Sequence, residues 1–269
     1  MQIIDSQIHL WSGGQSPAHH RQSPYLIPDA LRDMKEAGVD AAVNCPAIWD
    51  PASNDYAAEA ARQHPDKFAT LGWFDVTRPA AEGFFDAFMA QPGMLGLRFV
   101  LVSPAHQALL RSGELDWIWQ AADRRALPVG LITAPALNDA VANIAERFSN
   151  MRLLIDHLGI GPFTKLPEAA DQLDGLLALA RFANIAVKAS GTPSMATDGY
   201  PFKSIDPLLR RTFDAFGPRR MFWGTDITRL PCSWAECVTA FIEHLDWLKA
   251  DDLASVMGRG VCEWIGWSR

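Results

Sequence analysis

Ionisable side chains stand at the ends of several short apolar runs of this sequence. His9 ends the first run, Arg98 lies inside the fourth, and His157 and Asp226 follow the sixth and the eighth. Imidazoles and a carboxylate can move a proton to or from a bound water, and a guanidinium can bind a carboxylate through two parallel hydrogen bonds. Brought together, these four groups would suit acid–base chemistry on a small anion. Taken singly, each could equally be a packed histidine or one half of a buried ion pair.

The apolar runs have the length and composition of parallel strands that are buried on both faces. Each is about four to eight residues long, bounded by turn-forming residues, and apolar without alternation. The predicted strands are Gln2–His9, Val39–Cys45, Phe68–Phe74, Met94–Val100, Pro128–Thr133, Arg152–Asp156, Asn184–Ala189 and Met221–Gly224.

Amphipathic stretches alternate with these runs and predict helices. They are Pro28–Ala37, Asp55–His64, Arg78–Ala90, Glu114–Arg125, Ala136–Phe148, Glu168–Phe182, Asp206–Phe216 and Ser233–Leu248, with a short helix near Leu253–Met257. Eight strand–helix units predict a single α/β domain over residues 1–269, a (β/α)₈ TIM barrel. The glycine-rich motifs of nucleotide-binding folds do not occur in the sequence.

A barrel of this kind carries its chemistry at the carboxyl ends of the strands and in the loops after them. Asp5 and Asp156 also stand near strand ends, where we expect them to anchor neighbouring loops. The further candidates for substrate binding are Gln7, Trp11, Trp49, Trp73, Lys188, Arg229 and Arg21, the last beside His20 in the loop after the first strand. The tryptophans would wall a pocket for a flat or ring-shaped substrate, although tryptophan more often serves packing alone.

Five segments carry a resemblance to a known family. They are Ile4–Trp11, Gly93–Phe99, Leu154–Gly159, Val187–Gly191 and Phe222–Asp226. In this order and spacing they resemble the amidohydrolase superfamily, and within it the amidohydrolase-2 group, which contains lactonases acting on sugar acids and on 2-pyrone-4,6-dicarboxylate. The resemblance covers nearly the whole chain and implies a barrel hydrolase.

The departures from the family pattern concern the metal. The family's first strand usually offers two histidines, whereas this chain has Gln7 before His9, and the fourth strand carries Arg98 where relatives place a bridging ligand. We therefore expect no metal cofactor. The alternative is one divalent ion, zinc or manganese, held by His9, His157 and Asp226.

The resemblance and the residues together lead us to expect hydrolysis of a lactone or related ester of a small carboxylic acid. Asp226 would take a proton from water, His9 and His157 would polarise the carbonyl, and Arg98 would bind a substrate carboxylate. Two alternatives stay open: an isomerase or non-oxidative decarboxylase of the same superfamily, and a non-catalytic barrel that binds an aromatic acid.

Charge and composition limit the partners. With 24 Lys and Arg against 31 Asp and Glu, the formal charge is −7, which argues against a nucleic-acid or anionic-membrane partner. We expect a cytoplasmic protein, because no signal peptide or membrane span is apparent and the four cysteines are scattered. Whether the chain forms a homo-oligomer is left open.

Overall fold

Eight parallel strands form the centre of the computed structural model, which describes residues 1–77 and 83–269. The strands are ordered β1 to β8 as in the chain, so that each strand pairs with its neighbours in sequence. Their bounds are β1 (Ile4–Ile8), β2 (Ala41–Asn44), β3 (Phe68–Gly72), β4 (Met94–Val100), β5 (Pro128–Ile132), β6 (Arg152–Ile155), β7 (Ile185–Ala189) and β8 (Met221–Trp223). Every residue of β1, β2, β3, β7 and β8 is buried. Most of these residues are apolar, and the polar ones buried with them include Asp5, Gln7 and Lys188.

A buried carboxylate holds the seam where β8 returns to β1. The Asp226 amide donates to the Gln7 carbonyl at 2.7 Å. Beside it, Asp5 accepts hydrogen bonds from the Thr225 amide at 2.9 Å and the Trp234 indole at 2.8 Å. Burial raises the pKa of Asp5 to about 7 in spite of these donors. Asp5 thus anchors the loop after β8, as the sequence led us to expect.

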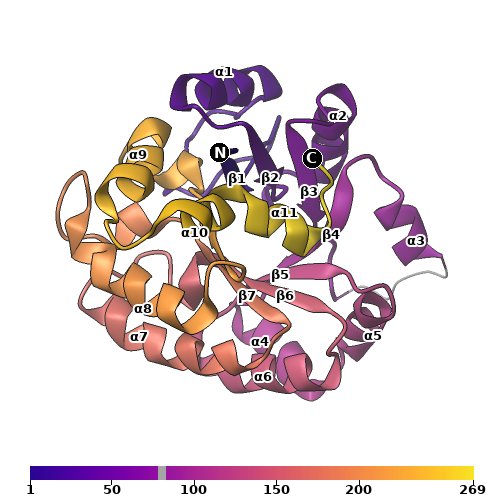
Figure 1. Cartoon of the computed structure of the whole chain (residues 1–269). Helices are drawn as coiled ribbons and strands as arrows, with labels where there is room; N and C mark the ends of the chain where they lie inside the picture. The colour runs from indigo at the N-terminus through magenta and orange to yellow at the C-terminus, as the bar shows by residue number, and fades with distance from the viewer. Residues whose placement is uncertain (78–82) are drawn as a thin grey trace.

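Helices surround the barrel on its outside (Figure 1). They are α1 (Ile27–Ala37), α2 (Ser53–Gln63), α3 (Phe84–Met89), α4 (Pro104–Ser112), α5 (Asp116–Arg124), α6 (Asn138–Arg147), α7 (Glu168–Leu177), α8 (Asp206–Phe216), α9 (Trp234–His244), α10 (Ala250–Ala254) and α11 (Gly260–Ile265). The first helix shows how the sequence sets their ends: Pro28 lies in its first turn, and Gly38 ends it in the left-handed conformation at φ 71°. The predicted (β/α)₈ barrel is confirmed.

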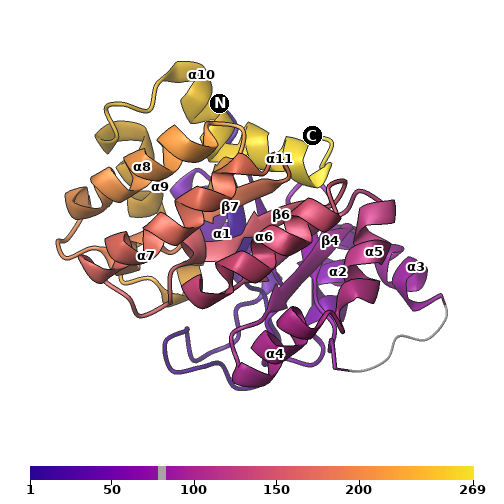
Figure 2. The ribbon, with the colours of Figure 1, turned by 90° about the horizontal axis from the view of Figure 1, so that it is seen from below.

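The last segment of the chain closes the end of the barrel where the strands begin. Figure 2 shows both termini at the same end as α10 and α11, with α4 at the other end. A π-helical turn, Ser255–Arg259, joins α10 to α11 and packs against β1 and β8. A Cβ atom on Gly258 would lie 2.9 Å from the Gln2 carbonyl oxygen, so glycine permits this close approach. The site must therefore lie at the opposite end.

The helix predictions miss two elements, α4 and α11. No helix was predicted for α4, although the Ser103 hydroxyl accepts a hydrogen bond from the His106 amide at 3.2 Å and Pro104 follows, which is a readable start signal. The short predicted helix near 253–257 is instead α10, the π-helical turn and α11. The predicted helix 78–90 begins in residues 78–82, outside the described part of the chain, and its described part is α3.

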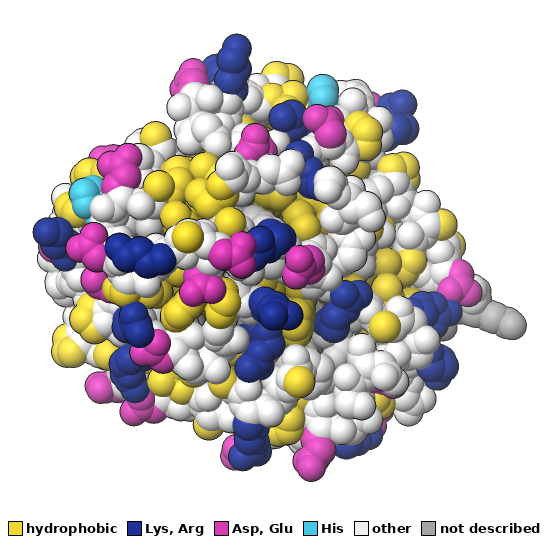
Figure 3. All heavy atoms as spheres, in the orientation of Figure 1, with side chains coloured by type: hydrophobic (Ala, Val, Ile, Leu, Met, Phe, Trp, Pro, Cys, Tyr) yellow, Lys and Arg dark blue, Asp and Glu magenta, His cyan; other side chains and the backbone are white. Residues whose placement is uncertain are grey.

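The surface agrees with the mixed composition of the chain. Acidic and basic side chains are interspersed over the face seen in Figure 3, and neither sign forms a large field there. Among the described residues, none of the helices has both the length and the apolar character needed to cross a membrane.

Candidate active site

A cavity of about 480 Å³ opens at the carboxyl ends of the strands. Its charged and imidazole lining includes His9 after β1, Arg98 within β4, His157 after β6, and Asp226 and Arg229 after β8. Their side chains are almost wholly buried. The fold therefore brings together the four residues for which the sequence predicted a catalytic role, and with them Arg229, one of the predicted binding residues.

Two of these residues are positioned by unusual backbone geometry. His157 and Asp226 have φ angles of 54° and 58°, in the left-handed region that residues other than glycine seldom adopt. His157 lies in the turn Asp156–Gly159 that follows β6, and Asp226 directly precedes the turn Ile227–Arg229 that follows β8. A left-handed backbone at a residue other than glycine is strained and persists only where the surrounding structure maintains it. Such residues are typical of functional sites.

Asp226 is the centre of the site's polar contacts. Its Oδ1 lies 3.2 Å from His9 Nε2, while its Oδ2 lies 2.6 Å from Arg229 Nε and 3.6 Å from His157 Nε2. Burial raises the pKa of this carboxyl, but His9 and Arg229 lower it by more, so its pKa stays well below the usual range. Asp226 is therefore an ionised carboxylate at neutral pH.

Ser190 holds the His157 ring in place. Its hydroxyl lies 2.9 Å from Nδ1 and accepts from the His157 amide at 3.3 Å, and its carbonyl oxygen lies 3.3 Å from the same Nδ1. The carbonyl can only accept a hydrogen bond, whereas the hydroxyl can donate or accept, so Nδ1 has a partner in either neutral tautomer. Burial and the nearby Arg229 cation lower the pKa of His157 to about 3, so the ring is neutral, and its Nε2 lies toward Asp226.

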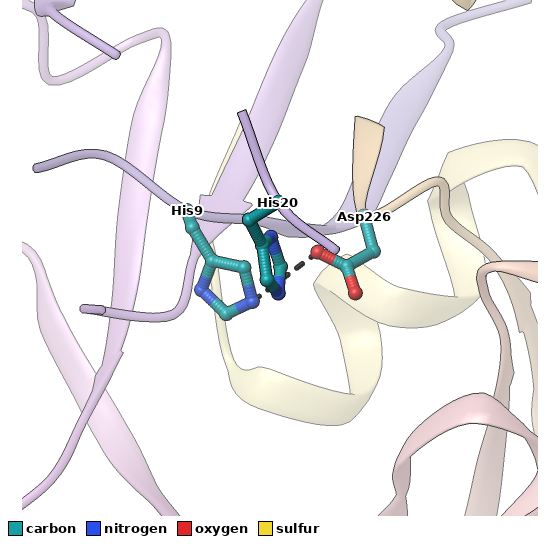
Figure 4. A group of neighbouring side chains, drawn as sticks. All are labelled: His9, His20 and Asp226. Atoms are coloured by element: carbon teal, nitrogen blue, oxygen red, sulfur yellow. Dashed lines mark ion pairs between the residues drawn. The ribbon is translucent and has the colours of Figure 1, made fainter. Parts of the chain in front are cut away.

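His9 and His20 face Asp226 from the β1 side, as Figure 4 shows. His9 Nδ1 lies 2.5 Å from the Cys45 carbonyl and must donate to it, which leaves Nε2 directed at Asp226. The His20 ring centre is 5.5 Å from that of His9, and its Nδ1 lies 2.9 Å from the Thr228 hydroxyl. Burial lowers the pKa of His20 to about 3.

A second buried carboxylate, Asp156, organises the floor beneath the cavity. Its Oδ2 accepts from Arg98 Nε at 2.8 Å, and its Oδ1 lies 2.9 Å from Lys188 Nζ. Lys188 also donates to Gln7 Oε1 at 2.6 Å. Burial would raise the pKa of Asp156, but Lys188 and Arg98 hold it at about 2. The expectation that Asp156 only anchors a loop is thus corrected, because it pairs with two cations from other strands.

The buried charges of this cluster do not cancel. Arg98, Lys188 and Arg229 are set against Asp156 and Asp226, which leaves one positive charge in excess. Only Nε of Arg98 is used by Asp156, and no side chain or carbonyl of the described residues accepts from its two terminal nitrogens. Since Arg98 lines the cavity, those nitrogens are placed to bind an anion.

The remaining predicted binding residues separate into lining and supporting positions. Trp49 lines the cavity, its ring centre 4.8 Å from that of His20. Trp11 packs behind it, with ring centres 5.3 Å apart, and is itself fully buried. Gln7 and Lys188 are also fully buried and are not among the lining residues, so both support the floor from within the barrel.

Two predicted residues lie away from this cavity. Trp73 lines a neighbouring cavity, and its indole donates to the Ser53 hydroxyl at 3.3 Å. Arg21 lies over the Tyr25 ring at 5.2 Å and donates to the Ser23 hydroxyl at 2.9 Å. The structure does not bring either side chain to Asp226.

Three ligand atoms in the site could hold one divalent ion, although not the three predicted. His9, His20 and Asp226 each offer an atom within 4.8 Å of the others, with His20 in the place predicted for His157. The buried Asp226 Oδ1 accepts no hydrogen bond from the described residues, and His9 is held through its other nitrogen by a carbonyl, as ligating histidines usually are. These residues fit a single zinc or manganese ion.

Fold and site together define a TIM barrel with a polar cluster at the carboxyl ends of its strands. Comparison with known proteins adds the family: the amidohydrolase family model matches residues 4–259, and the chain belongs to that family. The resemblance noted in the sequence is confirmed.

Individual relatives are distant. L-fucono-1,5-lactonase of Burkholderia ambifaria is 22% identical, with 96% of this chain and 93% of the relative covered. A zinc-bound amidohydrolase from Burkholderia multivorans superposes with a TM-score of 0.83 at 19% identity, over 99% of each chain. A protein from Pseudomonas putida assigned as a 2-pyrone-4,6-dicarboxylic acid hydrolase gives 0.80 at 19% identity, over 100% of this chain and 98% of the other.

The charge cluster predicts a large loss of stability when Asp156 is neutralised. Asp156→Asn leaves Arg98 and Lys188 buried without their counter-charge, and should cost about 3–5 kcal/mol in urea unfolding. Adding Lys188→Met should recover part of that loss. As a matched control, Asp116→Asn breaks an ion pair with Arg147 at the surface and should cost much less. An equal loss in both single variants would contradict this account of the floor.

Proposed function

We propose that this protein hydrolyses a lactone, or a related ester, of a small carboxylic acid. The observation that carries the proposal is the ionised Asp226 carboxylate, buried in the cavity wall between His9, His157 and Arg229. The names of the lactonase relative and of the pyrone hydrolase neighbour support the same reaction class.

The first step is attack by water on the lactone carbonyl carbon. Asp226 accepts one proton of the water as its oxygen bonds to that carbon, and the carbonyl oxygen becomes an oxyanion. Oδ1 is the candidate acceptor, because Oδ2 is already held by Arg229. His9 lies on the other side of the carboxylate, with its Nε2 3.2 Å from Oδ1.

The second step breaks the bond between the carbonyl carbon and the ring oxygen. In the tautomer that carries its proton on Nε2, His157 would stabilise the preceding oxyanion, and the contacts of Nδ1 with Ser190 hold the ring in place. The proton held by Asp226 then passes to the departing ring oxygen. The products are a hydroxyl group and a carboxylic acid, which releases the second proton of the water to solvent and becomes a carboxylate; no redox equivalent is needed.

Arg98 is proposed to bind a carboxylate of substrate or product. Arg98 lines the cavity, its terminal nitrogens donate to no group of the described residues, and the excess positive charge of the cluster favours an anion. The flat face of Trp49 on the cavity wall suits a ring beside that group.

We propose that this reaction needs no resident metal ion, although His9, His20 and Asp226 could hold one. A bound divalent ion would polarise the carbonyl and make water more acidic. Against it stand two permanent cations in the same cavity: Arg229, which already neutralises Asp226, and Arg98.

The proposed base predicts the effect of Asp226→Asn. The amide cannot accept the proton of water, so kcat for lactone hydrolysis should fall by about 10²–10⁴-fold. The exposed Asp139→Asn provides a matched control and should retain wild-type kcat. Undiminished kcat in Asp226→Asn, with unchanged circular dichroism, would remove Asp226 from the role of base.

Chelation tests the metal-free proposal. After dialysis against EDTA and confirmation by elemental analysis that zinc and manganese are absent, we expect the enzyme to retain most of its kcat/KM. A loss of tenfold or more, restored by adding either ion, would contradict the proposal. It would favour His9, His20 and Asp226 as ligands, and His20→Ala should then lower metal content.

A further inference from the structure

The cavity is divided into a polar side and an apolar side. His9, His20, Asp226 and Arg229 all follow β1 or β8. In an eight-stranded barrel the strands opposite these two are β4 and β5. The lining from the ends of β4 and β5 is mainly aliphatic: Val100, Val102, Ile132, Ala134 and Pro135.

The side chains along β4 show how the polarity of the cavity lining changes from its floor to its mouth. Residues two apart in a strand share a face, so that Arg98 and Val100 lie on the same side, with Val102 just beyond the strand. Arg98 is therefore deepest, and the lining becomes aliphatic toward the mouth. Val102 is 44% exposed at that end.

Few hydrogen-bonding groups interrupt this aliphatic wall. Gln172 lines the cavity, but its oxygen accepts from the Gly161 amide at 3.3 Å and its nitrogen donates to Thr164 at 3.4 Å and to Glu168 at 3.3 Å. Thr133 contributes one hydroxyl. A substrate with several hydroxyl groups would lose its water on this wall without finding new partners, which is unfavourable, whereas an alkyl or aryl group would gain from burial.

We propose that the substrate is a lactone that carries an apolar alkyl or aryl substituent, packed on the wall formed by Val100, Val102 and Ile132, rather than a polyhydroxylated sugar lactone. This inference rests on the proposed function, since it names the substrate class of the same site. The proposed substrate class thus differs from the sugar lactone that the name of the relative, L-fucono-1,5-lactonase, gives for that protein.

Three six-membered lactones test the inference: δ-valerolactone, its 6-pentyl derivative, and D-glucono-1,5-lactone, each corrected for uncatalysed hydrolysis. We expect kcat/KM for the pentyl lactone to exceed that for each of the others by about tenfold or more, because the pentyl chain is removed from water. A preference for gluconolactone, or no preference, would overturn the inference.

Two substitutions locate the contact. Val102→Thr keeps the shape and exchanges a methyl group for a hydroxyl, and Ile132→Thr makes the same exchange and also shortens the side chain by one carbon. Each should lower the ratio of kcat/KM for pentyl lactone over δ-valerolactone about fivefold or more. Val102 is partly exposed, so that this variant should fold normally. The matched control is Leu26→Thr, at an exposed position outside the cavity, which should leave the ratio unchanged. An unchanged ratio in both wall variants would also overturn the inference.

A binding measurement distinguishes a failure of this inference from a failure of the proposed function. If no lactone is hydrolysed, the proposed function fails, and calorimetry with the open-chain acids 5-hydroxydecanoate and gluconate decides the inference. Tighter binding of 5-hydroxydecanoate would support the apolar subsite. Equal or weaker binding, or no binding of either, would overturn it.

Discussion

The buried charge of two carboxylates is the constraint on which the site depends. An ionised group inside a barrel is stable only when it is paired and hydrogen-bonded. Asp156 meets this condition with Arg98 and Lys188, and Asp226 meets it with Arg229. The pairs of Asp156 join the turn after β6 to β4 and β7, and that of Asp226 lies within the turn after β8. The Asp156 pairs therefore also fix how these strand ends sit around the cavity.

The same constraint explains the state of His157. Burial and the nearby Arg229 cation lower the pKa of this histidine to about 3, so its imidazole is neutral. Each ring is then oriented by a fixed partner: His9 by the Cys45 carbonyl, His157 by Ser190. A preorganised set of donors around a carboxylate costs little reorganisation during a reaction, which is how such sites gain most of their rate.

The fold was readable from the sequence because most residues of parallel strands buried on both faces are apolar, and because eight such runs alternate with helices. The site was partly readable for a related reason: His9, Arg98, His157 and Asp226 stand in or directly after strands, where the barrel geometry fixes the direction of the side chain. Asp156 carried the same signal, yet its pairing with Lys188 depends on a contact across strands that no local pattern shows.

Residues on loops were less predictable. Arg21 and His20 are neighbours after β1, but only His20 lines the cavity, since the loop's path decides which of the two faces inward. Trp73 directly follows β3, closer to its strand than Trp49 is to β2, yet its indole donates to Ser53 beside another cavity. Loop conformation depends on the whole fold, so that local spacing could not resolve these cases.

The most direct test of the account is turnover in H₂¹⁸O with a lactone substrate, followed by mass spectrometry of the product. Attack of activated water on the carbonyl carbon predicts one ¹⁸O atom in the product carboxylate and none in its hydroxyl group. Label in the hydroxyl group would contradict that attack. A product of isomerisation or decarboxylation, formed with no solvent oxygen, would contradict hydrolysis itself.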